Sequence, residues 1–187
     1  MGAGIKKGHG FLSHAILSFL DKADTIVISL TAACILYTRS VGVVYFVAGA
    51  STCSITVKLI KRAIRQPRPP PHVLVGRRVK ASFGMPSTHS ATITFFATYI
   101  AIASWCLPIH ATLPAHARFV PIVTTPLAMT IVMSRIWLGY HTWPQVAVGC
   151  AYGCSLAMMW FMLWTKGGVR EVGQVLERGV WKLYGWS

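Results

Sequence analysis

From Thr25 to Arg170 the chain contains no Asp or Glu, although this stretch holds every long apolar segment. The acidic residues of the chain are Asp21, Asp24, Glu171 and Glu177. Uncharged apolar runs of about 20 residues are typical of membrane-spanning helices. Hydrophobic residues make up 54% of the sequence and charged residues 12%, a balance that also favours a membrane protein. The chain is therefore predicted to be an integral membrane protein.

The apolar runs divide into five predicted spans. Two lie between Thr25 and Ile60, on either side of a break at 39–42, and the others cover about 90–107, 119–138 and 146–164. Segments 11–20 and 169–184 are predicted to be amphipathic helices on the membrane surface. The predicted fold is an all-α, polytopic transmembrane helix bundle. Its parts are an N-terminal interfacial segment (1–24), a membrane domain (25–165) and an amphipathic tail (166–187).

The missing carboxylates exclude several kinds of chemistry. A core without Asp or Glu cannot hold magnesium or calcium through carboxylates, and it offers no acid/base carboxylate pair. Catalysis would depend on the side chains of His, Ser, Thr, Tyr, Cys, Lys and Arg, and we expect no metal and no cofactor. The formal charge is +14, from 18 Lys and Arg against 4 acidic residues. Because the basic residues alternate with apolar runs, membrane lipids or an anionic substrate are favoured as partners over nucleic acid.

Span counting predicts that three polar segments meet on one side of the membrane. They follow the second span, precede the third and follow the fourth. Their candidate site residues are Lys61, Arg68, Ser87, His89, Arg135, His141 and Gln145. Three cations, two histidines and a hydroxyl suit a phosphate group, whose oxygens guanidinium groups bind in pairs.

Helix ends add to this anion site. Ser87 precedes the third span and is predicted to be its N-cap, and Pro144 is expected at the first position of the fifth. Two helix N-termini would then direct backbone N–H groups at the phosphate. Other Lys and Arg residues beside the spans are interpreted mainly as membrane anchors. Arg135 differs because it lies inside an apolar run, where a charge usually has a function.

These segments resemble the tripartite signature of the type 2 phosphatidic acid phosphatase superfamily, and most closely its dolichyl diphosphatase branch. The resemblance rests on Gln-Pro-Arg-Pro at 66–69, Gly-Met-Pro-Ser-Thr-His at 84–89 and Ser-Arg-Ile-Trp-Leu-Gly-Tyr-His-Thr-Trp-Pro-Gln at 134–145. It covers about residues 25–164. The third motif of the superfamily normally ends in Asp, whereas this chain has Gln145, as that branch does.

The resemblance implies a metal-free mechanism with a phosphohistidine intermediate. His141 would attack phosphorus, and His89 would protonate the leaving oxygen and then activate water. The phosphoryl oxygens would be held by Lys61, Arg68, Ser87 and Arg135. Gln145 could accept a hydrogen bond from His141 and orient its ring, but without the charge of an Asp.

The favoured function is hydrolysis of a polyisoprenyl diphosphate, with dolichyl diphosphate as the first candidate. The alternatives are a phosphatase of phosphatidate or a sphingoid phosphate, an inactive protein that binds lipid phosphate, and a basic channel or transporter subunit. The resemblance implies an endoplasmic reticulum protein with a lumenal site and a role in protein glycosylation, whereas the distribution of Lys and Arg favours a cytoplasmic site. The oligomeric state is left open.

Overall fold

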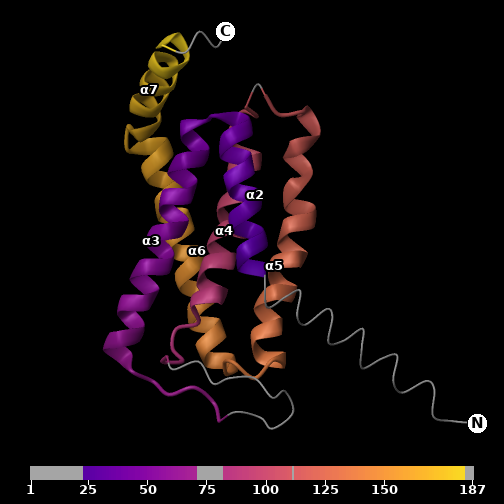
Figure 1. Ribbon diagram of the computed structural model, residues 1–187, viewed down its shortest axis with the longest axis vertical. Helices are drawn as coiled ribbons and strands as arrows, with labels where there is room; N and C mark the ends of the chain where they lie inside the picture. Colours follow the sequence, from indigo (N-terminus) through magenta and orange to yellow (C-terminus); the bar gives the residue numbers. More distant parts are fainter. Residues whose placement is uncertain (1–22, 71–81, 111, 184–187) are drawn as a thin grey trace, which may run out of the picture.

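The computed structural model describes the chain except for residues 1–22, 71–81, 111 and 184–187 (Figure 1). The described part is helical and contains no strand, which confirms the all-α prediction. Its elements are α2 (Ala23–Thr38), α3 (Val41–Ile64), α4 (Thr88–Cys106), the 3-10 helix η2 (Ala115–Phe119), α5 (Val120–Trp137), α6 (Trp143–Lys166) and α7 (Val169–Leu183). The helix predicted for 11–20 lies outside the described residues.

Each of the five predicted spans corresponds to one of the helices α2 to α6. Three helical stretches are long and apolar enough to cross a membrane: Val41–Ile64, Ala115–Trp137 and Trp143–Lys166. α2 has only 16 residues. α4 has 19 residues but begins with the polar sequence Thr88-His89-Ser90. Because α4 packs against α3, α5 and α6, neighbouring helices rather than lipid cover much of its surface.

The first two spans are separated by a short break, as predicted. Arg39 adopts a left-handed backbone conformation with a φ of 50°, which ends α2. The Ser40 hydroxyl then accepts a hydrogen bond from the Gly42 N–H at 3.2 Å and caps α3. The chain therefore reverses direction within two residues.

Small residues bring α4 and α6 into close contact. Gly149, Gly153 and Ala157 are four residues apart and buried, so they lie on one face of α6. A Cβ atom on Gly153 would collide with the backbone oxygen of Ala91, and one on Gly149 would lie 2.7 Å from the Ser87 oxygen. Such spacing lets helix backbones approach closely in membranes.

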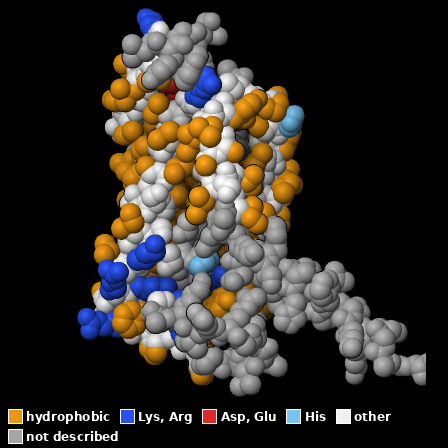
Figure 2. Space-filling view, in the orientation of Figure 1, with side chains coloured by type: hydrophobic (Ala, Val, Ile, Leu, Met, Phe, Trp, Pro, Cys, Tyr) orange, Lys and Arg blue, Asp and Glu red, His pale blue; other side chains and the backbone are white. Residues whose placement is uncertain are grey.

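Successive helices end on alternate sides of the bundle, as the span count predicts. The ends of α3 and α5 and the beginnings of α4 and α6 lie together at the lower end of the bundle in Figure 1. Figure 2 shows hydrophobic side chains over the middle of the bundle and a group of Lys and Arg side chains at its lower end, beside the end of α3. The polar segments therefore converge on one side, as span counting predicts.

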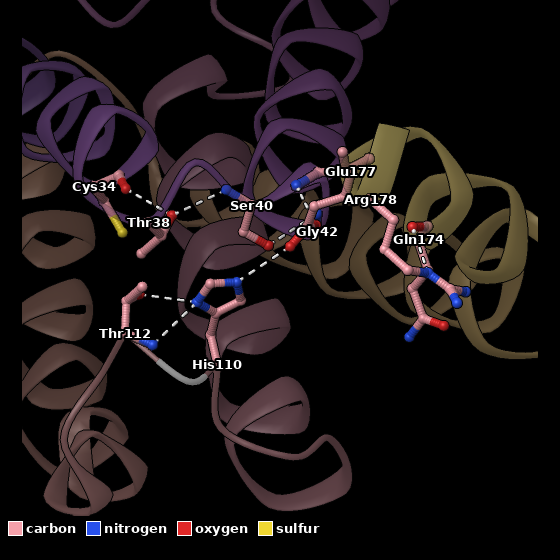
Figure 3. Close-up of polar contacts among 10 residues, drawn as sticks. Cys34, Thr38, Ser40, Gly42, His110, Thr112, Gln174, Glu177 and Arg178 are labelled. Carbon is pink, nitrogen blue, oxygen red and sulfur yellow. Dashed lines mark hydrogen bonds and ion pairs between the residues drawn. The ribbon is translucent and has the colours of Figure 1, made fainter. Parts of the chain in front are cut away.

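α7 is attached at the opposite end of the bundle (Figure 1), through contacts drawn in Figure 3. Glu177 accepts a hydrogen bond from the Val41 N–H at 3.0 Å and pairs with His110 Nε2 at 3.3 Å. His110 Nδ1 lies 2.8 Å from Thr112 Oγ1. α7 covers nearly all of the predicted segment 169–184 and leaves Val172, Val175, Leu176 and Val180 exposed. Its location on the membrane surface remains a prediction.

Candidate active site

The seven candidate residues all lie at the lower end of the bundle. They occupy the last turn of α3 (Lys61), the segment after it (Arg68), the N-cap and first turn of α4 (Ser87 and His89), the last turn of α5 (Arg135), the α5–α6 connection (His141) and the first turn of α6 (Gln145). Packing of four helix ends therefore brings together residues from three separate sequence motifs.

Most of these polar side chains are buried. Arg135 is 1% exposed and His141 4%, and Lys61, Ser87 and Gln145 are also buried. Burying a cation is costly unless an opposite charge or hydrogen bonds compensate. The segments that build the site contain no carboxylate at all. An anionic ligand with several oxygens would supply the complementary charge.

Arg135 positions the loop that carries His141. Its backbone oxygen accepts hydrogen bonds from the N–H groups of Tyr140 at 3.0 Å and His141 at 3.2 Å. Gly139, with a φ of 71°, provides the left-handed turn that this arrangement needs. The Arg135 side chain donates from Nε to Ser134 Oγ at 3.2 Å, and its guanidinium carbon lies 5.8 Å from the Tyr140 ring centre.

Arg68 is oriented by a residue that lies 14 positions away. Its Nε donates to the Ser82 backbone oxygen at 3.0 Å, and its Nη2 donates to Ser82 Oγ at 2.7 Å. These two bonds use one edge of the guanidinium. The remaining N–H groups are available to a phosphate ligand.

Ser87 connects the beginnings of α4 and α6. Its hydroxyl accepts from the Ser90 N–H at 3.4 Å and the Ser90 hydroxyl at 2.9 Å, which confirms the predicted N-cap. Its backbone N–H donates to the Gln145 backbone oxygen at 3.0 Å. α6 begins at Trp143, so Pro144 is at the second helical position rather than the first. Both helix N-termini thus lie at the site, where their dipoles favour an anion.

Gln145 fixes the orientation of the His141 ring. Its Nε2 donates to Gln66 Oε1 at 3.1 Å and to the Pro67 oxygen at 3.0 Å. Its Oε1 accepts from the Thr142 N–H at 3.2 Å and lies 3.2 Å from His141 Nδ1. Because the Pro67 oxygen can only accept and the Thr142 N–H can only donate, the amide has one orientation. His141 must therefore carry its proton on Nδ1, which leaves the Nε2 lone pair free.

The surroundings of His141 keep its ring neutral. Burial, followed by the positive charges of Arg68 and Lys61, lowers the pKa of His141 from 6.5 to about 3. The hydrogen bond to Gln145 opposes this shift, and His89 adds to it. At neutral pH the imidazole is therefore in the unprotonated form that a nucleophile requires.

Comparison with known proteins agrees with this arrangement. The PAP2 superfamily matches residues 40–168, a range that contains all seven candidate residues. The chain belongs to the PAP2 superfamily. A crystal structure of a transmembrane PAP2-type phosphatidylglycerolphosphate phosphatase from Bacillus subtilis has the same fold, with a TM-score of 0.60, 21% identity, and coverage of 78% of this chain and 73% of that one.

Several curated proteins are similar to this chain in sequence. Dolichyldiphosphatase 1 of Homo sapiens is 32% identical over 163 residues, which cover 82% of this chain and 66% of that protein. Dolichyldiphosphatase of Saccharomyces cerevisiae is 27% identical, with coverages of 87% and 70%. Lipid phosphate phosphatase gamma of Arabidopsis thaliana is 32% identical, with coverages of 67% and 55%. The chain thus spans slightly less than two thirds of the human relative's length.

Some residues of this PAP2 site are missed by sequence reasoning. Gln66 and Pro67 hold the Gln145 amide, and Ser82 holds Arg68. Gly84 packs closely against the Gln145 side chain. A Cβ atom added to Gly84 would lie 2.7 Å from Cδ of Gln145. Gln66 and Gly84 belong to the quoted motifs, and this membership was the sequence signal that could have identified them. No sequence signal pointed to Ser82. Within the described residues, no three His, Cys, Asp or Glu side chains form a metal-binding group.

Proposed function

We propose that this chain is a membrane lipid phosphatase that converts a polyisoprenyl diphosphate, with dolichyl diphosphate as the first candidate, to the monophosphate and inorganic phosphate. The observation that supports it is a neutral, buried His141 that feels the positive charges of Arg68 and Lys61, while its bond to Gln145 uses Nδ1 and leaves the Nε2 lone pair for attack. The dolichyldiphosphatase names of relatives favour this substrate class. Residues 25–165 are proposed as the phosphatase domain.

The proposed reaction has two displacements at phosphorus. His141 Nε2 forms a bond to the terminal phosphorus, and the bond from phosphorus to the bridging oxygen breaks while His89 protonates that oxygen. His89 then takes a proton from water, whose oxygen displaces His141 and releases phosphate. Lys61, Arg68, Ser87 and Arg135 bind the equatorial oxygens, whose charge grows in the transition state. The lipid monophosphate leaves in the first displacement, and the second displacement regenerates neutral His141.

A phosphatase of smaller lipid phosphates is the second candidate, because lipid phosphate phosphatase gamma is among the relatives. Either enzyme would act at the membrane, and we propose the endoplasmic reticulum membrane with a lumenal site. A protein that only binds lipid phosphate is less favoured, because Gln145 holds His141 in an orientation suited to attack.

The test is release of inorganic phosphate by the purified protein in detergent. Dolichyl diphosphate, phosphatidate and sphingosine phosphate are compared at equal mole fractions. His141→Ala is expected to lower kcat by about 10³-fold or more. His116→Ala, an exposed position in η2 at the other end of the bundle, is the matched control.

Three results would contradict the proposal. One is the absence of phosphate release from every lipid, and another is near-normal turnover by His141→Ala. The third is failure to trap acid-labile phosphate on the wild-type protein under conditions in which turnover is measurable, because a phosphohistidine must form in each cycle.

A further inference from the structure

A cavity of about 990 Å³ extends from the site into the membrane-spanning part of the bundle. Its polar end is lined by Lys61, Arg68 and His89, which belong to the phosphate site. Its other end is lined by Ile35, Val47 and Phe96, which are apolar. The cavity therefore changes from cationic to hydrocarbon-like along its length, as an amphiphilic ligand requires.

The cavity walls are single faces of three helices. α2 contributes positions 28, 32 and 35, and α3 contributes positions 47, 51 and 54. Both sets follow the three- and four-residue spacing of one helix face. α4 closes the groove with Thr92 and Phe96. Ile28 is 67% exposed and Ile55 57%, so the rim of the groove faces the surroundings of the bundle, where lipid lies.

The polar contacts occur at one end, which sets the direction of a bound lipid. Along α3 the groove extends from Lys61 to Val47. With a rise of 1.5 Å per residue, this separation corresponds to about 21 Å. A lipid whose phosphate lies at Lys61 and Arg68 would place only the first part of its chain between α2, α3 and α4. Any remaining length would lie in the bilayer.

We propose that this groove binds the hydrocarbon chain of the substrate and recognises only about the first 21 Å next to the phosphate. The inference rests on the proposed function and adds a rule for specificity. Affinity should increase with chain length until the groove is filled, because each added methylene buries apolar surface. Further lengthening of the chain should then leave the affinity unchanged, because the added part lies in lipid or detergent hydrocarbon both before and after binding.

Two matched pairs of substitutions test the groove. Ala32 and Ser51 line it and are exposed, so Phe at either position would fill it from the open side. Ala33 and Ala48 are exposed residues of the same two helices that do not line it. Each of the four residues is changed to Phe. The values of kcat/KM are measured in mixed micelles for polyisoprenyl diphosphates of increasing length.

In the wild type, kcat/KM should increase with length and then become constant. Ala32→Phe and Ser51→Phe should lower the ratio of kcat/KM for a long substrate to that for the shortest substrate hydrolysed by about tenfold or more. Ala33→Phe and Ala48→Phe should keep the wild-type ratio. The groove proposal is overturned if all four variants keep that ratio, or if all four lose it equally. A wild type that hydrolyses no member of the series would instead overturn the proposed function.

Discussion

Gln145 joins two segments of the site through one side-chain amide. It contacts Gln66 and Pro67 before α4, the Thr142 N–H at the start of α6, and His141. An Asp at this position could accept from His141 and Thr142, but it could not donate to Gln66 or Pro67. The amide thus replaces the charge of a carboxylate with a second connection to the segment that carries Arg68.

Gln145→Ala is expected to lower kcat more than it changes KM. Without the amide the His141 ring can rotate and change tautomer, and misplacement of a reacting group by about 1 Å can cost roughly 10²-fold in rate. Steady-state kinetics on the best substrate measure both constants. Gln174→Ala, on the exposed side of α7, serves as the control. Equal rates for wild type and Gln145→Ala would show that another group holds His141.

His141 should remain neutral through pH 5 in the ligand-free protein. The folded pKa, about 3, lies below the usual 6.5 because of burial and the charges of Arg68 and Lys61. Between these values the unfolded state binds more protons, so the free energy of unfolding increases with pH there. This contribution is complete above pH 6.5 and is lost as pH falls towards 3.

Ring ¹⁵N shifts of histidine-labelled protein, assigned with His141→Gln, measure this titration directly. Arg68→Gln should raise the pKa of His141, since it removes the largest of the positive charges that oppose protonation. The denatured protein is the reference. Titration near pH 6.5 in the folded, ligand-free protein would contradict the described burial.

The pair formed by α4 and α6 is the element that aligns the site. Gly149 and Gly153 allow close approach, and the bond from the Ser87 N–H to the Gln145 oxygen joins the beginnings of the two helices. The positions of Ser87, which we propose binds phosphate, and of Gln145, which orients the His141 ring, therefore depend on the packing of the helices that carry them. The same contact places both helix N-termini at one point.

Gly153→Ala is expected to destabilise the protein by about 1–3 kcal/mol, since the new methyl group overlaps the Ala91 backbone oxygen. The melting temperature should fall by several degrees, and activity should fall with it because α6 moves away from α4. Gly179→Ala is the matched control in α7, where nothing lies within 4 Å of the added Cβ. That change should be neutral or slightly stabilising. Equal melting temperatures for Gly153→Ala and wild type would refute the close approach.

On the scale of the whole molecule, the polar contacts described above lie at the two ends of a bundle whose middle is apolar. The candidate active site occupies one end, and the contact between Glu177 and His110 attaches α7 at the other (Figures 1 and 3). Changes in α7 should therefore affect stability without changing the site directly. The core between the ends has no carboxylate, so the proposed phosphate chemistry would depend on cations and helix dipoles.

Activity should persist in EDTA and should be inhibited by vanadate. In the proposed mechanism, cationic side chains and helix N-termini supply the charge that a metal would otherwise provide, and vanadate can adopt the five-coordinate geometry that they would favour. Phosphate release is measured with and without each compound, beside a magnesium-dependent phosphatase as control. Complete loss in EDTA that magnesium restores would show that the reaction needs a metal.

The sequence by itself determined the helices, the side of the bundle on which the polar segments meet, and the seven residues gathered there. These properties depend on the length of apolar runs, on the alternation of span direction and on local motif spacing. Only the tertiary structure decided that α4 lies within the bundle and that Ser82 holds Arg68. It also decided that Gln145 bonds to Gln66, 79 residues away. These contacts arise from the packing of segments that are far apart in the sequence. The same packing produces the burial that lowers the pKa of His141 and the groove beside α2. A local sequence pattern contains no information about such packing.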